Sequence, residues 1–190
     1  NSMRFLILCS ALLASLSHAD WKITEPSSLT FLSTKNSDIT EVHHFRDIKG
    51  TLADNGYASM TINLRSVDTG IEVRNERMQS MLFEVSDFAE AKLTTNVDPV
   101  VMEKLEEGDL LKTEIRAKLS LHGEEVTFPA HVIVTPASDG SLTVSSSEPV
   151  LIHADQFGLV AGINKLRDVA KLKHIATVVP VSFTLTLKPE

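Results

Sequence analysis

Histidines are the residues of this sequence best suited to catalysis or metal binding, and only His43 and His44 are adjacent. Neighbouring residues of a β-strand point to opposite faces, so these two imidazoles are not expected to hold one metal ion together. His131 lies opposite the apolar face of its own segment. We therefore expect all three to be solvent-exposed strand residues and predict no metal site.

Carboxylates are numerous, but no catalytic or calcium-binding spacing connects them. Glu103, Glu106, Glu107 and Asp109 form an acidic run before a predicted strand. A calcium loop would need alternating oxygen ligands around a central glycine, and this run lacks that order. We interpret it as a solvated loop.

Motifs that carry other chemistry are missing as well. The sequence has no Gly-x-Ser-x-Gly, no glycine-rich phosphate loop and no His-Glu-x-x-His. Its single cysteine, Cys9, lies in the N-terminal segment. We predict no catalytic residues and no cofactor, and we interpret the protein as a binding protein and not an enzyme.

The first 19 residues are typical of a secretory signal peptide. Arg4 gives a positive start, an apolar run follows from Phe5 to Leu16, and Ser17–Ala19 has the small-x-small pattern of a cleavage site. Asn1 and Ser2, which precede Met3, are interpreted as a cloning scar. This predicts a periplasmic protein without a permanent membrane anchor. We expect the apolar segment, where present, to pack against an apolar surface such as a cavity of its own or a neighbouring chain.

Residues 20–190 are predicted to form a single domain with a net charge of −8, from 17 basic and 25 acidic side chains. An acidic chain with scattered lysines and arginines is a poor partner for nucleic acid or anionic membranes. Without Cys9 the domain has no disulfide, so its core alone must stabilise it.

Apolar and polar residues alternate over most of the domain, which predicts antiparallel strands with one apolar face. The clearest runs cover residues 59–64, 111–121, 126–134 and 179–187. Residues 71–82 and 163–174 instead suit two short helices. Many short strands with few helices indicate an all-β barrel or sandwich, and periodicity alone leaves both open.

The predicted helix 71–82 carries Met78 and Met81 on one face. Methionine adapts to irregular apolar surroundings, so the pair either fills a core or lines an apolar cavity. From the residue types and their spacing alone, the filled core is favoured over the cavity.

Four blocks, in order along the chain, resemble the YceI-like family of bacterial, mostly periplasmic, lipocalin-like barrels that bind polyisoprenoids. They are Trp21-Lys22-Ile23 with Ser28–Phe31, Ser66–Gly70 with Arg74-Asn75 and Phe83, Leu119–Gly123, and Asp155–Leu159. Ile71 and Asn75 depart from the usual residues of the second block, as does Leu82-Phe83-Glu84, and the stretch 163–174 suggests a subgroup.

The resemblance implies a lipocalin-like antiparallel β-barrel of about eight strands with an elongated apolar cavity. It also implies that the protein carries a polyisoprenoid or isoprenoid-quinone lipid, without catalysis. The helix 71–82 would cap the barrel, with Asp68 or Thr69 as its N-cap, Glu72 and Arg74 at a wet rim, and Met78 and Met81 inward. The predicted ligand-binding residues are Phe31, Phe45, Ile62, Leu64, Met78, Met81, Phe83, Leu93, Ile115, Leu119, Phe128, Val132, Phe157 and Phe183.

Two other functions stay open from sequence. One is a secreted β-sandwich interaction module with a solid core and no lipid. The other is an enzyme that acts on a lipid inside the barrel, which would need an inward polar residue with a shifted pKa. The sequence names neither the lipid nor its chain length, and it leaves open whether the protein forms a homodimer.

Overall fold

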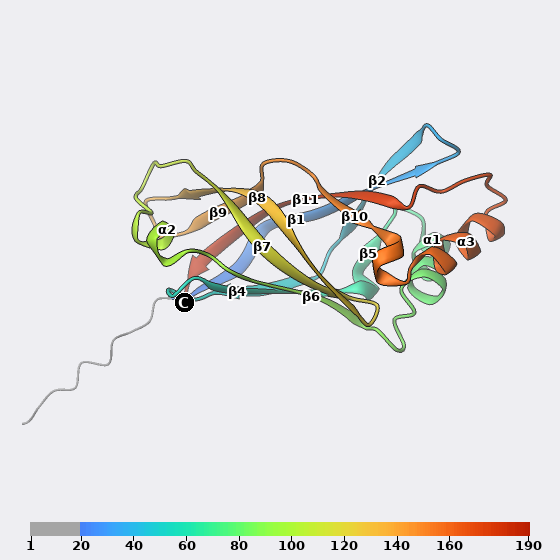
Figure 1. The fold of residues 1–190 in the computed structure, drawn as a ribbon, viewed down its shortest axis with the longest axis horizontal. Helices are drawn as coiled ribbons and strands as arrows, with labels where there is room; N and C mark the ends of the chain where they lie inside the picture. Colours follow the sequence, from blue (N-terminus) through green and yellow to red (C-terminus); the bar gives the residue numbers. More distant parts are fainter. Residues whose placement is uncertain (1–19) are drawn as a thin grey trace, which may run out of the picture.

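The computed structural model of the chain describes residues 20–190. The predicted signal peptide and its expected packing therefore lie outside the described residues. The alternating segments form strands of a closed antiparallel barrel, whose long axis runs horizontally in Figure 1. The fold predicted from the sequence is confirmed, and the sandwich alternative is wrong.

Eight strands form the closed ring because β1 pairs along its length with β11, from Trp21↔Pro189 to Phe31↔Val181. In spatial order, the ring consists of β1 (Trp21–Lys35), β11 (Val178–Pro189), β9 (Leu142–Ser146), β8 (Glu124–Pro136), β7 (Leu111–Leu121), β6 (Glu90–Asn96), β4 (Tyr57–Asn63) and β3 (Ile48–Leu52).

Three short strands extend the ring at one end. There β2 (Ile39–Phe45) replaces β3 as the partner of β1, and β10 (Val150–His153) replaces β9 as the partner of β11. The two-residue strand β5 (Val67–Asp68) pairs with β2. The β1–β2 hairpin projects beyond the barrel in Figure 1.

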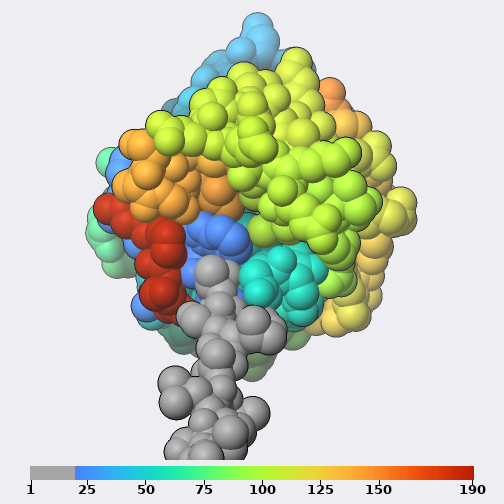
Figure 2. All heavy atoms as spheres, turned by 90° about the vertical axis from the view of Figure 1, so that its left-hand side faces the viewer, coloured from blue at the N-terminus to red at the C-terminus, as the bar shows by residue number. Residues whose placement is uncertain are grey.

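Helices lie at the two ends of the barrel (Figure 1). The end with the hairpin carries α1 (Glu72–Arg77), the π-helical turn η2 (Met78–Leu82) and α3 (Val160–Val169). The opposite end carries α2 (Pro99–Glu103). Two 3₁₀ turns, η1 (Leu64–Ser66) and η3 (Ala154–Phe157), lead toward the first group. Figure 2 looks onto the α2 end of the barrel. The segment around α2 and the C-terminal residues lie at this face.

The two predicted helices are found with different accuracy. The prediction for residues 71–82 is confirmed as α1 continued by η2. The bounds 163–174 are wrong, because α3 begins at Val160, two residues after the left-handed Gly158 (φ 64°), and ends at Val169, before Lys171 (φ 54°). Ile163 and Leu166 of α3 are buried, whereas Val169 at its end is exposed.

Candidate functional site

An apolar cavity of about 260 Å³ runs along the inside of the barrel. Strand β7 illustrates how the alternation builds it, since Thr113, Ile115, Ala117, Leu119 and Leu121 all face the cavity. These positions span eight residue steps, which corresponds to roughly 27 Å along an antiparallel strand. The cavity is therefore long and narrow, and its volume lies just below the range of about 300–1,000 Å³ that is usual for small-molecule sites.

The cavity wall is almost wholly hydrocarbon. Its only polar side chains are the hydroxyls of Thr51, Ser59, Thr95 and Thr113, and no ionisable side chain of residues 20–190 lines it. The Thr95 hydroxyl donates to the carbonyl of Arg116 at 2.8 Å, so that group is already satisfied. Such a wall can exclude water from an apolar ligand, but it contains no acid, base or strong nucleophile.

The two ends of the cavity are closed differently. At one end Leu82 and Phe83, from the η2 turn and the residue after it, and Ile163 of α3 line the cavity and are buried. At the other end Val101 and Met102 of α2 line the cavity but are only partly buried. Because little apolar surface is removed from water there, the α2 end is the less tightly packed of the two.

Three phenylalanines form an aromatic wall at the α1 end of the cavity. The ring centroids of Phe31 and Phe45 are 5.2 Å apart, and those of Phe45 and Phe83 are 5.8 Å apart. Both spacings lie within the range of favourable aromatic pairs. All three rings line the cavity.

Most of the residues predicted to bind ligand line this cavity. They are Phe31, Phe45, Ile62, Leu64, Phe83, Leu93, Ile115, Leu119, Phe128, Val132 and Phe183. The strand residues among them come directly from the period-two pattern, which puts alternate side chains on one face.

Met78, Met81 and Phe157 do not line the cavity, so their predicted place in the cavity wall is wrong. Met78 and Phe157 are buried in the core outside the cavity wall. In η2 the Phe83 N–H donates to the Met78 carbonyl at 2.9 Å, five residues back. The wider π-helical turn changes which side chains face inward, and Leu82 and Phe83 take the places expected for the methionines.

Sequence reasoning missed the contribution of the α2 segment, which supplies Val101, Met102 and Leu105 to the cavity wall. The acidic run Glu103–Asp109 hid this, because it is typical of a loop. Asp98 and Pro99 were the available signal. The Asp98 carboxylate accepts from the Val100 N–H at 2.9 Å, and proline suits the first turn of a helix.

The turn before α1 is held differently from the prediction. Asp68 does not cap the helix; it accepts from the Gly70 N–H at 2.9 Å and from the Arg46 guanidinium at 2.9 Å, and both contacts lower the pKa of the Asp68 carboxyl. The Asn75 side-chain oxygen instead accepts from Thr69 Oγ1 at 2.6 Å and from the Thr69 N–H at 2.7 Å. Asn75, within α1, thus fixes the turn at Thr69 that precedes this helix.

A second set of contacts, around His122, fixes the end of η2 and the turn η3. The His122 ring lies 2.6 Å from the Glu84 carboxylate through Nε2 and 3.0 Å from the Phe157 carbonyl through Nδ1. It packs against Phe88, with ring centroids 4.6 Å apart. His122 therefore connects the β7–β8 turn, the end of η2 and η3.

Two histidine predictions are resolved by the structure. His131 has 45 % of its side chain exposed, which confirms the prediction for that residue. His43 is 1 % exposed, so its predicted exposure is wrong. It lies opposite Phe31 in the β1–β2 pairing, and its ring packs edge-on against Phe31 with centroids 5.4 Å apart. Burial, and secondarily the Arg74 charge, lowers the pKa of His43.

Residues 20–190 contain no group of three His, Cys, Asp or Glu side chains placed to hold a metal ion. Among the helices of the same residues, none combines the length and apolar character that a bilayer crossing requires.

The sequence matches the model of the YceI-like domain over residues 21–187. The chain belongs to the YceI-like family. A polyisoprenoid-binding domain from Saccharophagus degradans, implicated in plant cell wall breakdown, has 35% sequence identity to it and a TM-score of 0.87, over 91% of this chain and 99% of that one.

More distant YceI-like folds are also similar. BcnA of Burkholderia cenocepacia has 18% identity and a TM-score of 0.66, over 84% of this chain and 95% of that one. The YCEI protein of Campylobacter jejuni has 15% identity and a TM-score of 0.56, over 78% and 84%. These two support the fold alone. A search of curated proteins found no match.

Proposed function

We propose that this protein binds a polyisoprenoid or isoprenoid-quinone lipid in the barrel cavity and carries it through the periplasm. The observation that carries the proposal is the long, nearly hydrocarbon cavity. An eight-stranded barrel has an interior just wide enough for one slender ligand. The Saccharophagus degradans relative, described as a polyisoprenoid-binding domain, supports the same class of ligand.

The energetics suit a carrier. Each CH₂ group removed from water is worth about 0.8 kcal/mol, so a tail gains much by leaving water for the cavity. Relative to a bilayer, where the tail is already in hydrocarbon, transfer into the cavity is near balance. A protein with this balance takes up its cargo and also releases it.

Binding without catalysis fits the wall better than an enzyme does. A general acid or base must lie within hydrogen-bond reach of the reacting group. The only polar groups on the wall are four hydroxyls, and no histidine or carboxylate of residues 20–190 is placed to activate them within the cavity.

Native mass spectrometry of the purified protein, isolated from a bacterial periplasm, tests the proposal. We expect a mass above that of the polypeptide, which collapses to the polypeptide mass when an apolar solvent extracts the lipid. The extract should contain an isoprenoid chain. Protein that carries no lipid, and takes none up from vesicles doped with a polyprenol, would contradict the proposal.

A further inference from the structure

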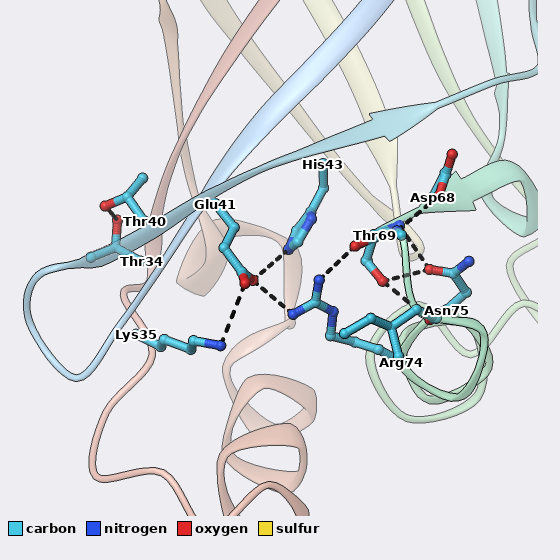
Figure 3. Close-up of polar contacts among 11 residues, drawn as sticks. Thr34, Lys35, Thr40, Glu41, His43, Asp68, Thr69, Arg74 and Asn75 are labelled. Atoms are coloured by element: carbon cyan, nitrogen blue, oxygen red, sulfur yellow. Dashed lines mark hydrogen bonds and ion pairs between the residues drawn. The ribbon is translucent and has the colours of Figure 1, made fainter.

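A polar cluster lies next to the aromatic wall, because the His43 ring packs against Phe31. Its side chains are drawn in Figure 3. We call it the His43–Arg74 cluster; it consists of Lys35, Glu41, His43 and Arg74. The first three come from the β1–β2 hairpin and the last from α1. Arg74 Nη1 lies 2.7 Å from Glu41 Oε2, and Lys35 Nζ lies 3.6 Å from Glu41 Oε1.

Two nitrogens of this cluster are buried without a hydrogen-bond partner among the described residues. They are Nδ1 of His43 and Nε of Arg74. His43 Nε2 lies 3.8 Å from Glu41, which is too long for a hydrogen bond. Buried polar groups are normally paired, so these two unpaired nitrogens of one cluster call for a partner that completes them.

The cluster adjoins the cavity. Along the inner face of β2, Phe45 lines the cavity, His43 follows two residues earlier, and Glu41 two residues earlier again. The His43 ring packs against Phe31, which is itself part of the cavity wall. This face of β2 thus changes from a hydrocarbon side chain to polar ones within two residues, as an amphiphile changes from tail to head group.

The opposite end of the cavity has the reverse character. Around α2 the exposed side chains include Asp98 and the acidic run Glu103–Asp109, with Lys104 as the only basic residue of that stretch. These carboxylates repel an anionic head group. They also accept hydrogen bonds and donate none, so they do not bind an acceptor oxygen.

We propose that the His43–Arg74 cluster binds the oxygen atoms at the polar end of the lipid cargo, while the tail lies in the cavity and points toward α2. This inference rests on the proposed function and adds the site and direction of the head group. The free Arg74 Nε–H is always a donor, and His43 Nδ1 is a donor in one of its two neutral tautomers, so the head group must offer an acceptor, either a phosphate or a carbonyl oxygen. A phosphate would also compete with Glu41 for the Arg74 guanidinium, which suits bidentate binding of such an anion.

Binding of three probes with the same tail tests this site: farnesyl phosphate, the ketone farnesyl acetone, and the hydrocarbon farnesene. Affinities are measured by titration with the full-length wild type, Arg74→Met, His43→Phe and Arg46→Met. Arg46 is the matched control because it also forms an ion pair at this end, with Asp68, but its side chain is 62% exposed and lies outside the cluster. If Arg74→Met does not fold, Arg74→Lys, which keeps the positive charge, is tested in its place.

We expect Arg74→Met and His43→Phe to weaken binding of at least one oxygen-bearing probe about ten-fold or more, since a hydrogen bond to a charged group is lost. Farnesene binding should change less than two-fold, and Arg46→Met should behave as wild type. The probe with the larger loss identifies a phosphate or a carbonyl as the preferred head group.

Equal losses for all three probes, or none, would overturn the head-group site while farnesene binding still supports a lipid cavity. Failure of wild type to bind any probe, farnesene included, would overturn the proposed function and the site together.

Discussion

Arg74 and Glu41 connect the helical cap to the barrel through a 2.7 Å contact between Nη1 and Oε2. The same guanidinium donates through Nη2 to the Thr69 carbonyl at 2.6 Å. One side chain of α1 therefore fixes both the β1–β2 hairpin and the turn that precedes the helix (Figure 3).

This contact should contribute measurably to stability. The Arg74 and Glu41 side chains are 24% and 36% exposed, between the fully exposed and fully buried cases. We expect Glu41→Gln and Arg74→Gln each to lower the free energy of unfolding by about 1–2 kcal/mol. The double variant should lose less than the sum of the two, because neither partner is then left unpaired. Urea denaturation measures all four proteins, and strictly additive losses would show that the pair is not coupled.

Stability should also fall in mildly acidic solution because of His43. Burial lowers the pKa of His43 in the folded protein below the value of 6.5 that is usual for histidine, so the unfolded chain binds the proton first as the pH falls. The stability that His43 contributes is fully present above pH 6.5 and is lost from there down to its folded pKa. For one proton, the slope is at most about 1.4 kcal/mol per pH unit.

Urea denaturation at pH 7.5 and 5.5, for wild type and His43→Phe, measures this effect. Phenylalanine keeps a ring against Phe31 but does not titrate. We expect wild type to lose more stability than the variant between the two pH values, and equal losses would contradict the assignment to His43.

The barrel and most of its cavity wall could be predicted from sequence, because they depend on strict alternation. Ile115, Leu119 and Phe128 needed only the rule that every second side chain points inward. The closing pair β1–β11 joins the two ends of the domain, and it became predictable only through the family resemblance.

The errors arose where a local pattern and the tertiary structure disagree. In β2, apolar Val42 suggests that its own face is the inner one, yet it is 56% exposed while His43 is buried. The strand has left the barrel there, and its inner face meets a polar helix. Met78 and Met81 were misplaced because periodicity does not distinguish a π-helical turn from an α-helical one.

Filling the cavity should remove lipid binding without harming the fold. Ala117 is fully buried on β7, lines the cavity and pairs with Phe128 on β8. Ala117→Phe places a ring in the cavity, where it gains contacts that the void lacks. We expect an unchanged or slightly higher melting temperature and at least a several-fold loss of retained lipid by native mass spectrometry.

Lys118→Phe is the matched control, since it adds a ring on the outer face of the same strand, where Lys118 is 53% exposed. Equal lipid retention in the two variants would contradict the role of the cavity.

Gly162 sets how closely α3 approaches the η2 turn. A Cβ atom at this position would lie 2.7 Å from the Met81 carbonyl oxygen and 2.9 Å from the Leu82 Cα, both of them backbone atoms that side-chain motion cannot clear. Gly162→Ala must therefore push α3 away from η2, and overpacking of this kind destabilises by about 1–3 kcal/mol. Because Leu82 and Ile163 line the cavity on the two sides of this contact, we also expect faster lipid release, measured as transfer to acceptor vesicles.

Ala161→Ser is the control, since it adds one atom at the neighbouring exposed position of the same helix. A Gly162→Ala variant as stable as Ala161→Ser, with wild-type release, would show that the cap does not depend on this close approach.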